Sequence, residues 1–193
     1  MSIDTIAVIG AADLGREIAR SALRGGYRVI LEDVSETVLE KAIATIRENL
    51  GKHVSSGRID AESCELVLRR LTIARRVEEA AREADFIIET VADELEMKLE
   101  LFTIFDKFAK PGAILASTTH MLAVDDLADM TFCAERCVGM RFAHEAEDAQ
   151  PVELVRGRAT SGETLEECRE IAHRMGLEVI ELRDDRTIPA ASD

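Results

Sequence analysis

The stretch I-A-V-I-G-A-A-D-L-G, residues 6–15, decides how this chain folds. It opens with an apolar run of strand length, and a turn framed by Gly10 and Gly15 follows. The pattern is the dinucleotide-binding fingerprint G-x-G-x-x-G with Ala12 at its middle position and an acid, Asp13, directly after it. It predicts a strand, a tight turn and a helix, with a cofactor pyrophosphate at the helix N-terminus.

The positions of this turn have separate roles in a dinucleotide-binding fold. Gly10 permits the tight turn out of the strand, and Gly15 allows the helix to pack closely on the strand. We expect the cofactor to be held by the central positions of the turn, which are Gly10, Ala12, Asp13, Leu14 and Gly15. A strand-to-helix turn that holds no ligand is the alternative interpretation of the same residues.

Two positions of the turn predict weakened cofactor binding. Ala12 adds a methyl group where the backbone should approach the pyrophosphate, and Asp13 adds a negative charge to the first helical turn. At about 5 Å and an effective dielectric of about 20, Asp13 would repel a phosphate by roughly 3 kcal/mol. Most of that cost disappears if Asp13 faces solvent or pairs with Arg16.

A second acid stands where an adenosine ribose would be bound. The predicted second strand, residues 27–31, is followed by Glu32 and Asp33. In the dinucleotide-binding fold, an acid at the end of this strand accepts hydrogen bonds from the ribose hydroxyls. Asp33 therefore favours NAD over NADP, because its charge would repel a 2′-phosphate.

Strand and helix patterns alternate along the rest of the chain, which predicts a doubly wound α/β fold, a Rossmann-like parallel sheet covered on both faces. We expect one domain over residues 1–183, a helical hairpin inserted over residues 35–71 and a loose tail over residues 184–193. The predicted strands cover residues 6–9, 27–31, 71–74, 85–90, 113–117, 137–142, 152–156 and 177–182. The predicted helices cover residues 14–23, 35–50, 60–71, 77–84, 94–108, 124–130 and 163–175, with a turn over residues 51–57 inside the hairpin.

The composition argues against several classes of partner. The formal net charge of the 193 residues is −14 and the acids are spread along the chain, so the surface would repel nucleic acid and anionic lipid. No apolar stretch approaches the roughly 20 residues that span a bilayer, and the N-terminus shows no signal-peptide pattern. The four cysteines form no C-x-x-C pair. We therefore expect reduced thiols, no membrane partner and a cytoplasmic location.

Several longer stretches are similar to those of one enzyme family. In chain order they are E-D-V-S-E (32–36), E-T-V-A-D-E-L-E-M-K-L-E-L-F (89–102), P-G-A-I-L-A-S-T-T (111–119), V-G-M-R-F (138–142) and P-V-E-L-V-R-G (151–157). Together with the glycine turn and the hairpin, these stretches make the chain resemble the NAD-binding domain of the 3-hydroxyacyl-CoA dehydrogenases over residues 3–183.

This resemblance implies an NAD-dependent oxidoreductase of fatty-acyl-CoA metabolism that converts a 3-hydroxyacyl-CoA to the 3-ketoacyl form. In the family the hairpin helps to hold the CoA, a histidine removes the hydroxyl proton, and a glutamate orients that histidine. A serine and an asparagine hold the substrate oxygen. The family's C-terminal helical domain, which makes the dimer and closes over the substrate, has no counterpart in these 193 residues. A partner chain is one way to supply it.

The family's site residues fall on a mixture of matching and differing side chains. The orienting glutamate is Glu153, whereas the catalytic histidine position, in the family's G-M-H-F, is Arg141. The serine position falls at His120 and the asparagine position at His144. We assign the remaining cofactor contacts to residues at the ends of the predicted strands or in the helix that follows one of them, namely Asp33, Asp93 (a glutamate in the family), Lys98 and Ser117.

Arg141 leaves the chemistry of the chain open between two functions. A guanidinium stays protonated at any working pH, so Arg141 cannot be a general base. It would form a salt bridge with Glu153 and leave an inert cleft, or His120 would act as a relocated base near the nicotinamide. The chain is then either a 3-hydroxyacyl-CoA dehydrogenase or a catalytically degenerate dinucleotide-binding module that acts as a sensor or assembly partner. His120, His144 and Cys137 lack a metal-ligand spacing, so we expect no metal site.

Overall fold

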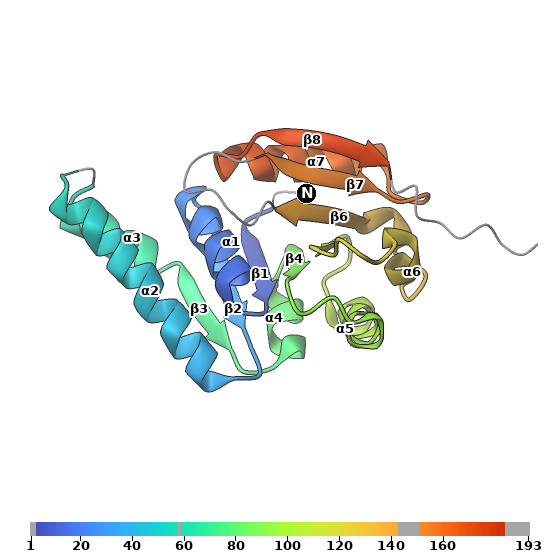
Figure 1. Ribbon diagram of the computed structural model, residues 1–193, viewed down its shortest axis with the longest axis horizontal. Helices are drawn as coiled ribbons and strands as arrows, with labels where there is room; N and C mark the ends of the chain where they lie inside the picture. Colours follow the sequence, from blue (N-terminus) through green and yellow to red (C-terminus); the bar gives the residue numbers. More distant parts are fainter. Residues whose placement is uncertain (1–2, 58, 143–150, 184–193) are drawn as a thin grey trace, which may run out of the picture.

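The structure is a computed structural model, and it describes residues 3–57, 59–142 and 151–183. These residues form one sheet of eight strands in the order β3-β2-β1-β4-β5-β6-β7-β8 (Figure 1). The strands are β1 Thr5–Ile9, β2 Arg28–Glu32, β3 Leu71–Ala74, β4 Phe86–Glu89, β5 Ile114–Ser117, β6 Cys137–Phe142, β7 Val152–Arg156 and β8 Val179–Arg183. The helices are α1 Asp13–Arg24, α2 Glu36–Ser55, α3 Ala61–Leu68, α4 Val77–Glu83, α5 Leu95–Phe108, α6 Val124–Ala128 and α7 Gly162–Arg174, with a 3₁₀ turn η1 at Ala134–Arg136. The predicted doubly wound α/β fold is confirmed.

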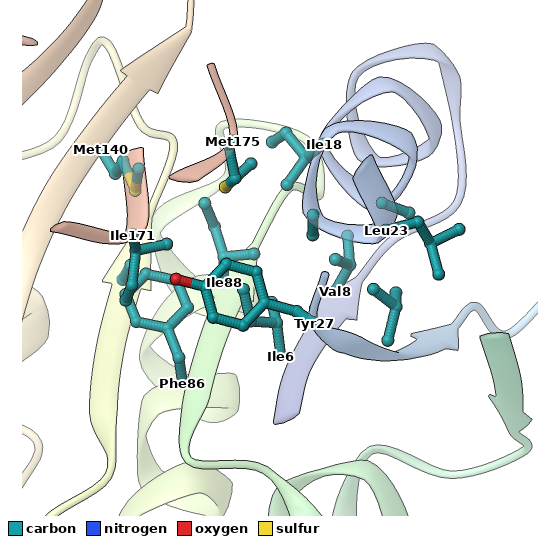
Figure 2. Close-up of a cluster of buried hydrophobic side chains, with 14 of the residues drawn as sticks. Ile6, Val8, Ile18, Leu23, Tyr27, Phe86, Ile88, Met140, Ile171 and Met175 are labelled. Atoms are coloured by element: carbon teal, nitrogen blue, oxygen red, sulfur yellow. The ribbon is translucent and has the colours of Figure 1, made fainter. Parts of the chain in front are cut away.

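Two hydrophobic layers, one on each face of the sheet, hold the helices in place. Alternate residues of β1 divide between them, because Ile6 and Val8 join one layer while Ala7 and Ile9 join the other. Helices α1, α2 and α7 contribute to the first layer, and helices α4, α5 and α6 contribute to the second. Figure 2 shows the centre of the first layer, where Tyr27 lies with Phe86 among aliphatic and methionine side chains. Since both faces are covered, the central strands are continuous apolar runs.

The glycine turn lies where the order of the strands changes direction. Strand β1 pairs with β2 on one side and with β4 on the other, and both pairings are parallel. The chain therefore builds β2 and β3 outward on one side before it returns to add β4 on the other side. Doubly wound proteins bind their ligands at the carboxyl ends of the strands at this kind of switch point.

One edge of the sheet differs from the predicted parallel arrangement. Strand β7 runs antiparallel to β6, with Arg141 opposite Glu153, and β8 is again parallel to β7. The connection from Phe142 to Val152 is shorter than the dozen or more residues that a parallel crossover needs. The short connection therefore requires β7 to run in the opposite direction.

The predicted hairpin is present as α2 and α3, which lie side by side beyond β3 (Figure 1). The side chains of Ser35 and Asp60 accept hydrogen bonds at the two helix N-termini, as capping residues do. Helix α2 is longer than predicted, because it continues through Gly51 and ends at Ser55. The reversal comes at Gly57, which adopts a φ of 71°.

Some predictions fall on residues outside the described ranges. These are the loose tail over residues 184–193 and the assignment of His144, which both stay predictions. Across the described residues, no helix combines the length and the apolar character needed to cross a membrane.

Candidate functional site

The glycine turn joins β1 to α1 and is closely packed. Gly10 adopts a φ of +100°, a conformation that residues with a side chain rarely adopt. A Cβ placed on Gly15 would lie 1.9 Å from the carbonyl oxygen of Gly10. Thr90, which follows β4, supports the turn, since its Oγ1 donates towards the carbonyl oxygens of Ile9 and Gly10 at 3.0 and 3.1 Å. Both glycines therefore occupy positions that exclude a side chain.

The two departures from the fingerprint leave the phosphate position open. Ala12 is the exposed N-cap of α1, and among the described residues no side chain caps this helix. Asp13 is 89% exposed and pairs with Arg16 at 2.9 Å, which removes most of the repulsion predicted for a bound phosphate. Leu14 is half-buried beside them. An uncapped helix N-terminus offers donor N–H groups and partial positive charge, so this turn fits a pyrophosphate.

Asp33 links the glycine turn to the end of β2. Its Oδ2 accepts a hydrogen bond from the Ala11 N–H and its Oδ1 accepts one from the Ser35 N–H, each at 2.8 Å. Because each carboxylate oxygen has about two acceptor sites, Asp33 retains capacity for ribose hydroxyls. A groove of about 560 Å³ lies beside Asp33 and is lined by Asp33, Val34, Glu36, Leu39, Glu40, Ile43, Ile73 and Arg75.

A buried ion pair lies between β4 and α5. Lys98 is 1% exposed and Glu89 is 0% exposed. The Lys98 Nζ donates to both carboxylate oxygens of Glu89 at 2.6 and 2.7 Å, and the Ser117 Oγ donates to Oε2 at 2.7 Å. Burial raises the pKa of Glu89, and the Lys98 ammonium opposes that rise. The structure thus places the predicted residues Lys98 and Ser117 in one cluster around a buried glutamate.

Asp93 holds the turn that follows β5. Its Oδ2 accepts hydrogen bonds from the backbone N–H groups of His120 and Met121 at 3.0 and 2.9 Å. Its Oδ1 lies 3.6 Å from the Lys98 Nζ. Burial acts to raise the pKa of Asp93. The hydrogen bonds from the Thr119 side chain and from the backbone of the turn outweigh this effect and hold the pKa of Asp93 below its usual range. Asp93 therefore positions the turn that carries the exposed side chain of His120.

Arg141 contacts the same turn from β6. Its Nε donates to the Thr119 carbonyl oxygen at 2.8 Å. Glu153, its cross-strand partner, is 41% exposed, and its Oε2 lies 3.9 Å from Nη1. The guanidinium is therefore farther from Glu153, at 3.9 Å, than from the Thr119 carbonyl oxygen, at 2.8 Å. Its close contact is with the turn after β5. The structure therefore brings Arg141, Glu153 and the turn before His120 together, while the role of His120 as a relocated base stays a prediction.

Two acids at the carboxyl edge of the sheet were not among the predicted site residues. Glu32 is the last residue of β2, and Glu89 is the last residue of β4. Both are buried, at 2% and 0% exposure. The sequence signal that could have indicated them is an acid as the last residue of an otherwise apolar strand. Backbone pairing holds such a residue in the sheet, so its side chain stays buried.

Glu32 predicts a pH-dependent contribution to stability. Burial raises the pKa of Glu32 from 4.5 to about 7, and Asp33 and Glu78 add to the rise. A raised folded-state pKa stabilises the fold below pH 4.5, and this contribution is lost as the pH rises towards about 7. Between about pH 5 and pH 8, wild type should therefore lose on the order of 2 kcal/mol of unfolding free energy relative to Glu32→Gln. Urea unfolding of both proteins tests this, and a pH-independent difference would contradict it.

The strand order, the glycine turn and the acid after β2 together define a dinucleotide-binding domain of the doubly wound class. The family model "3-hydroxyacyl-CoA dehydrogenase, NAD binding domain" matches residues 5–185. The chain therefore belongs to the 3-hydroxyacyl-CoA dehydrogenase family, a family of NAD-dependent oxidoreductases, and it corresponds to the NAD-binding domain.

Individual relatives agree with this family. The chain is 32% identical to the probable 3-hydroxybutyryl-CoA dehydrogenase of Bacillus subtilis, with 95% of this chain and 64% of the relative covered. It is 34% identical to the 3-hydroxybutyryl-CoA dehydrogenase of Bradyrhizobium diazoefficiens, with 92% and 60% covered. The crystal structure of the 3-hydroxybutyryl-CoA dehydrogenase from Escherichia coli K12 superposes with a TM-score of 0.89 at 31% identity, over 95% of this chain and 39% of that one. The chain thus spans less than two thirds of the length of these relatives.

Proposed function

We propose that this chain binds NAD as a cofactor module of the 3-hydroxyacyl-CoA dehydrogenase type and does not oxidise the alcohol by itself. Arg141 is the observation that carries the proposal. It occupies the position of the family's catalytic base, and its Nε is bonded to the Thr119 carbonyl oxygen. A protonated guanidinium has no lone pair with which to take the hydroxyl proton.

The cofactor half of the proposal rests on the geometry at β1 and β2. The uncapped N-terminus of α1 would hold the pyrophosphate, and Asp33 would accept the ribose hydroxyls. The groove beside Asp33 has apolar walls at Leu39, Ile43 and Ile73, which suit the face of an adenine ring. When bound, NAD supplies the acceptor for a hydride. An acid at the ribose position favours NAD over NADP.

A second candidate function is the complete dehydrogenase reaction on a 3-hydroxyacyl-CoA, alone or with a partner chain that supplies a helical domain. The buried cluster of Lys98, Glu89 and Ser117 favours this function, as does Glu153 at the position of the family's orienting glutamate. The hairpin of α2 and α3 would then contact the CoA. His120 would have to serve as the base, on a turn that Asp93 already positions.

Two measurements on the full chain separate these functions. A fluorescence titration with NADH should show binding. With NAD and 3-hydroxybutyryl-CoA, wild type should form NADH at the background rate, whereas Arg141→His should form it at least tenfold faster, since a positioned general base contributes about 10²–10⁴-fold. Arg156→His, at an exposed arginine of β7, is the matched control and should stay at background. Robust turnover by wild type would overturn the proposal in favour of the dehydrogenase.

A further inference from the structure

The terminal nitrogens of Arg141 have hydrogen-bonding capacity that the described residues do not use. Nε donates to Thr119 at 2.8 Å, so one edge of the guanidinium is fixed. Nη1 lies 3.9 Å from the Oε2 of Glu153, beyond hydrogen-bond distance. Nη2 is buried and has no hydrogen-bond partner among the described residues. The fixed side chain therefore presents a two-pronged fork of donors.

This arrangement is unfavourable unless an acceptor completes it. A buried donor of a charged group loses its water, and the loss is not recovered without a new hydrogen bond. Glu153 cannot supply it from its present position, because it is 41% exposed and its attraction is screened by water. The Arg141 side chain is itself 14% exposed, so part of it borders solvent although Nη2 is buried.

We propose that Arg141 anchors the carboxylate of a small organic acid at the carboxyl edge of β5 and β6. A planar guanidinium matches a carboxylate through two parallel hydrogen bonds. The fork also lies beside the turn after β5, at the edge of the sheet where doubly wound domains bind ligands. This inference deepens the proposed function, on which it rests, by naming a free carboxylic acid instead of a thioester as the ligand class.

The surroundings of Arg141 favour a singly charged ligand. Asp93 holds the turn that contains Thr119, and Glu153 stands opposite Arg141 on β7. These carboxylates, on a chain of formal net charge −14, repel a phosphate dianion more strongly than a single carboxylate. Glu153 also competes for the same guanidinium. Neutralising Glu153 should therefore strengthen ligand binding, whereas neutralising Arg141 should weaken it.

Isothermal titration calorimetry of the full chain, with and without NADH, tests the proposal with 3-hydroxybutyrate and its neutral amide, 3-hydroxybutanamide, as probes. Wild type should bind the acid at least tenfold more tightly than the amide. Arg141→Gln should remove that discrimination, and Arg141→Lys should retain part of it because it keeps the charge without the fork. Glu153→Gln should tighten acid binding about threefold or more. Arg156→Gln, which makes the same charge change at an exposed position of β7, should alter it less than twofold.

Three results of these titrations would overturn or separate the proposals. Equal binding of acid and amide by wild type, or unchanged discrimination in Arg141→Gln, would overturn the carboxylate site. Equal losses in Arg141→Gln and Arg156→Gln would also overturn it, because they would reflect net charge alone. An NADH titration of the same samples separates the two proposals. Retained NADH binding without acid discrimination defeats only the carboxylate site, whereas absent NADH binding defeats the proposed function.

Discussion

The Lys98→Met variant should be less stable than wild type by about 3–5 kcal/mol, the cost typical of removing one partner of a buried ion pair. The Lys98 ammonium contacts both carboxylate oxygens of Glu89, and both side chains are almost completely buried. Without it, Glu89 keeps the hydrogen bonds from Ser117 and the Val91 N–H, but its charge is uncompensated. Since domains are stable by about 5–15 kcal/mol, urea unfolding followed by circular dichroism would resolve such a loss.

The double variant Lys98→Met with Glu89→Gln is the control for this explanation. A neutral amide carries no uncompensated charge and still accepts hydrogen bonds, so the double variant should recover most of the lost stability. The single variant should also lose less at pH 5 than at pH 8. Its Glu89 has a folded-state pKa raised by burial, and a group of this kind contributes stability that is lost as the pH rises. A double variant as unstable as the single one would show that packing of the lysine stem, and not charge, is the cause.

The parts of the fold that local pattern determines were predictable from the sequence. The strand-turn-helix at residues 6–15 and the caps at Ser35 and Asp60 depend on residues that are neighbours in the chain. The end of α2 was predicted wrongly. Glycine often ends a helix, so the sequence suggested that α2 stops before Gly51, but the helix continues to Ser55. Gly51 makes no close contact that would force the chain to turn there. The direction of β7 follows from the length of a connection, which periodicity does not report.

In the candidate site, too, the residues of a local motif were predictable and the contacts between distant residues were not. The glycine turn and Asp33 were predictable because a contiguous motif and one strand end contain them. The contacts of Arg141 with Thr119, and of Asp93 with His120, join residues far apart in sequence, and they depend on how the turn after β5 lies between β6 and the loop that precedes α5. The long distance of 3.9 Å between Arg141 Nη1 and Glu153 Oε2 likewise could not be predicted from the sequence.

Replacing Gly15 with alanine should destabilise the protein by about 3 kcal/mol and weaken NADH binding. The added Cβ would lie 1.9 Å from the Gly10 carbonyl oxygen and 2.7 Å from the Thr90 Oγ1. Backbone cannot yield to such an overlap as a flexible side chain does, so α1 must move away from β1. That movement would displace the helix N-terminus at which the pyrophosphate is expected. Urea unfolding and a fluorescence titration with NADH measure the two effects.

Gly51→Ala provides the matched control, because it makes the same chemical change inside a helix where, apart from the adjacent residues and backbone of that helix, the new methyl group meets no atom within 4 Å. Glycine costs a helix interior about 0.8–1 kcal/mol relative to alanine, so this variant should be slightly more stable than wild type and should bind NADH unchanged. The opposite signs of the two variants separate close packing from helix propensity. If Gly15→Ala were also neutral or stabilising, the tight approach of α1 to β1 would not be what the glycine is required for, and its place in the fingerprint would need another physical cause.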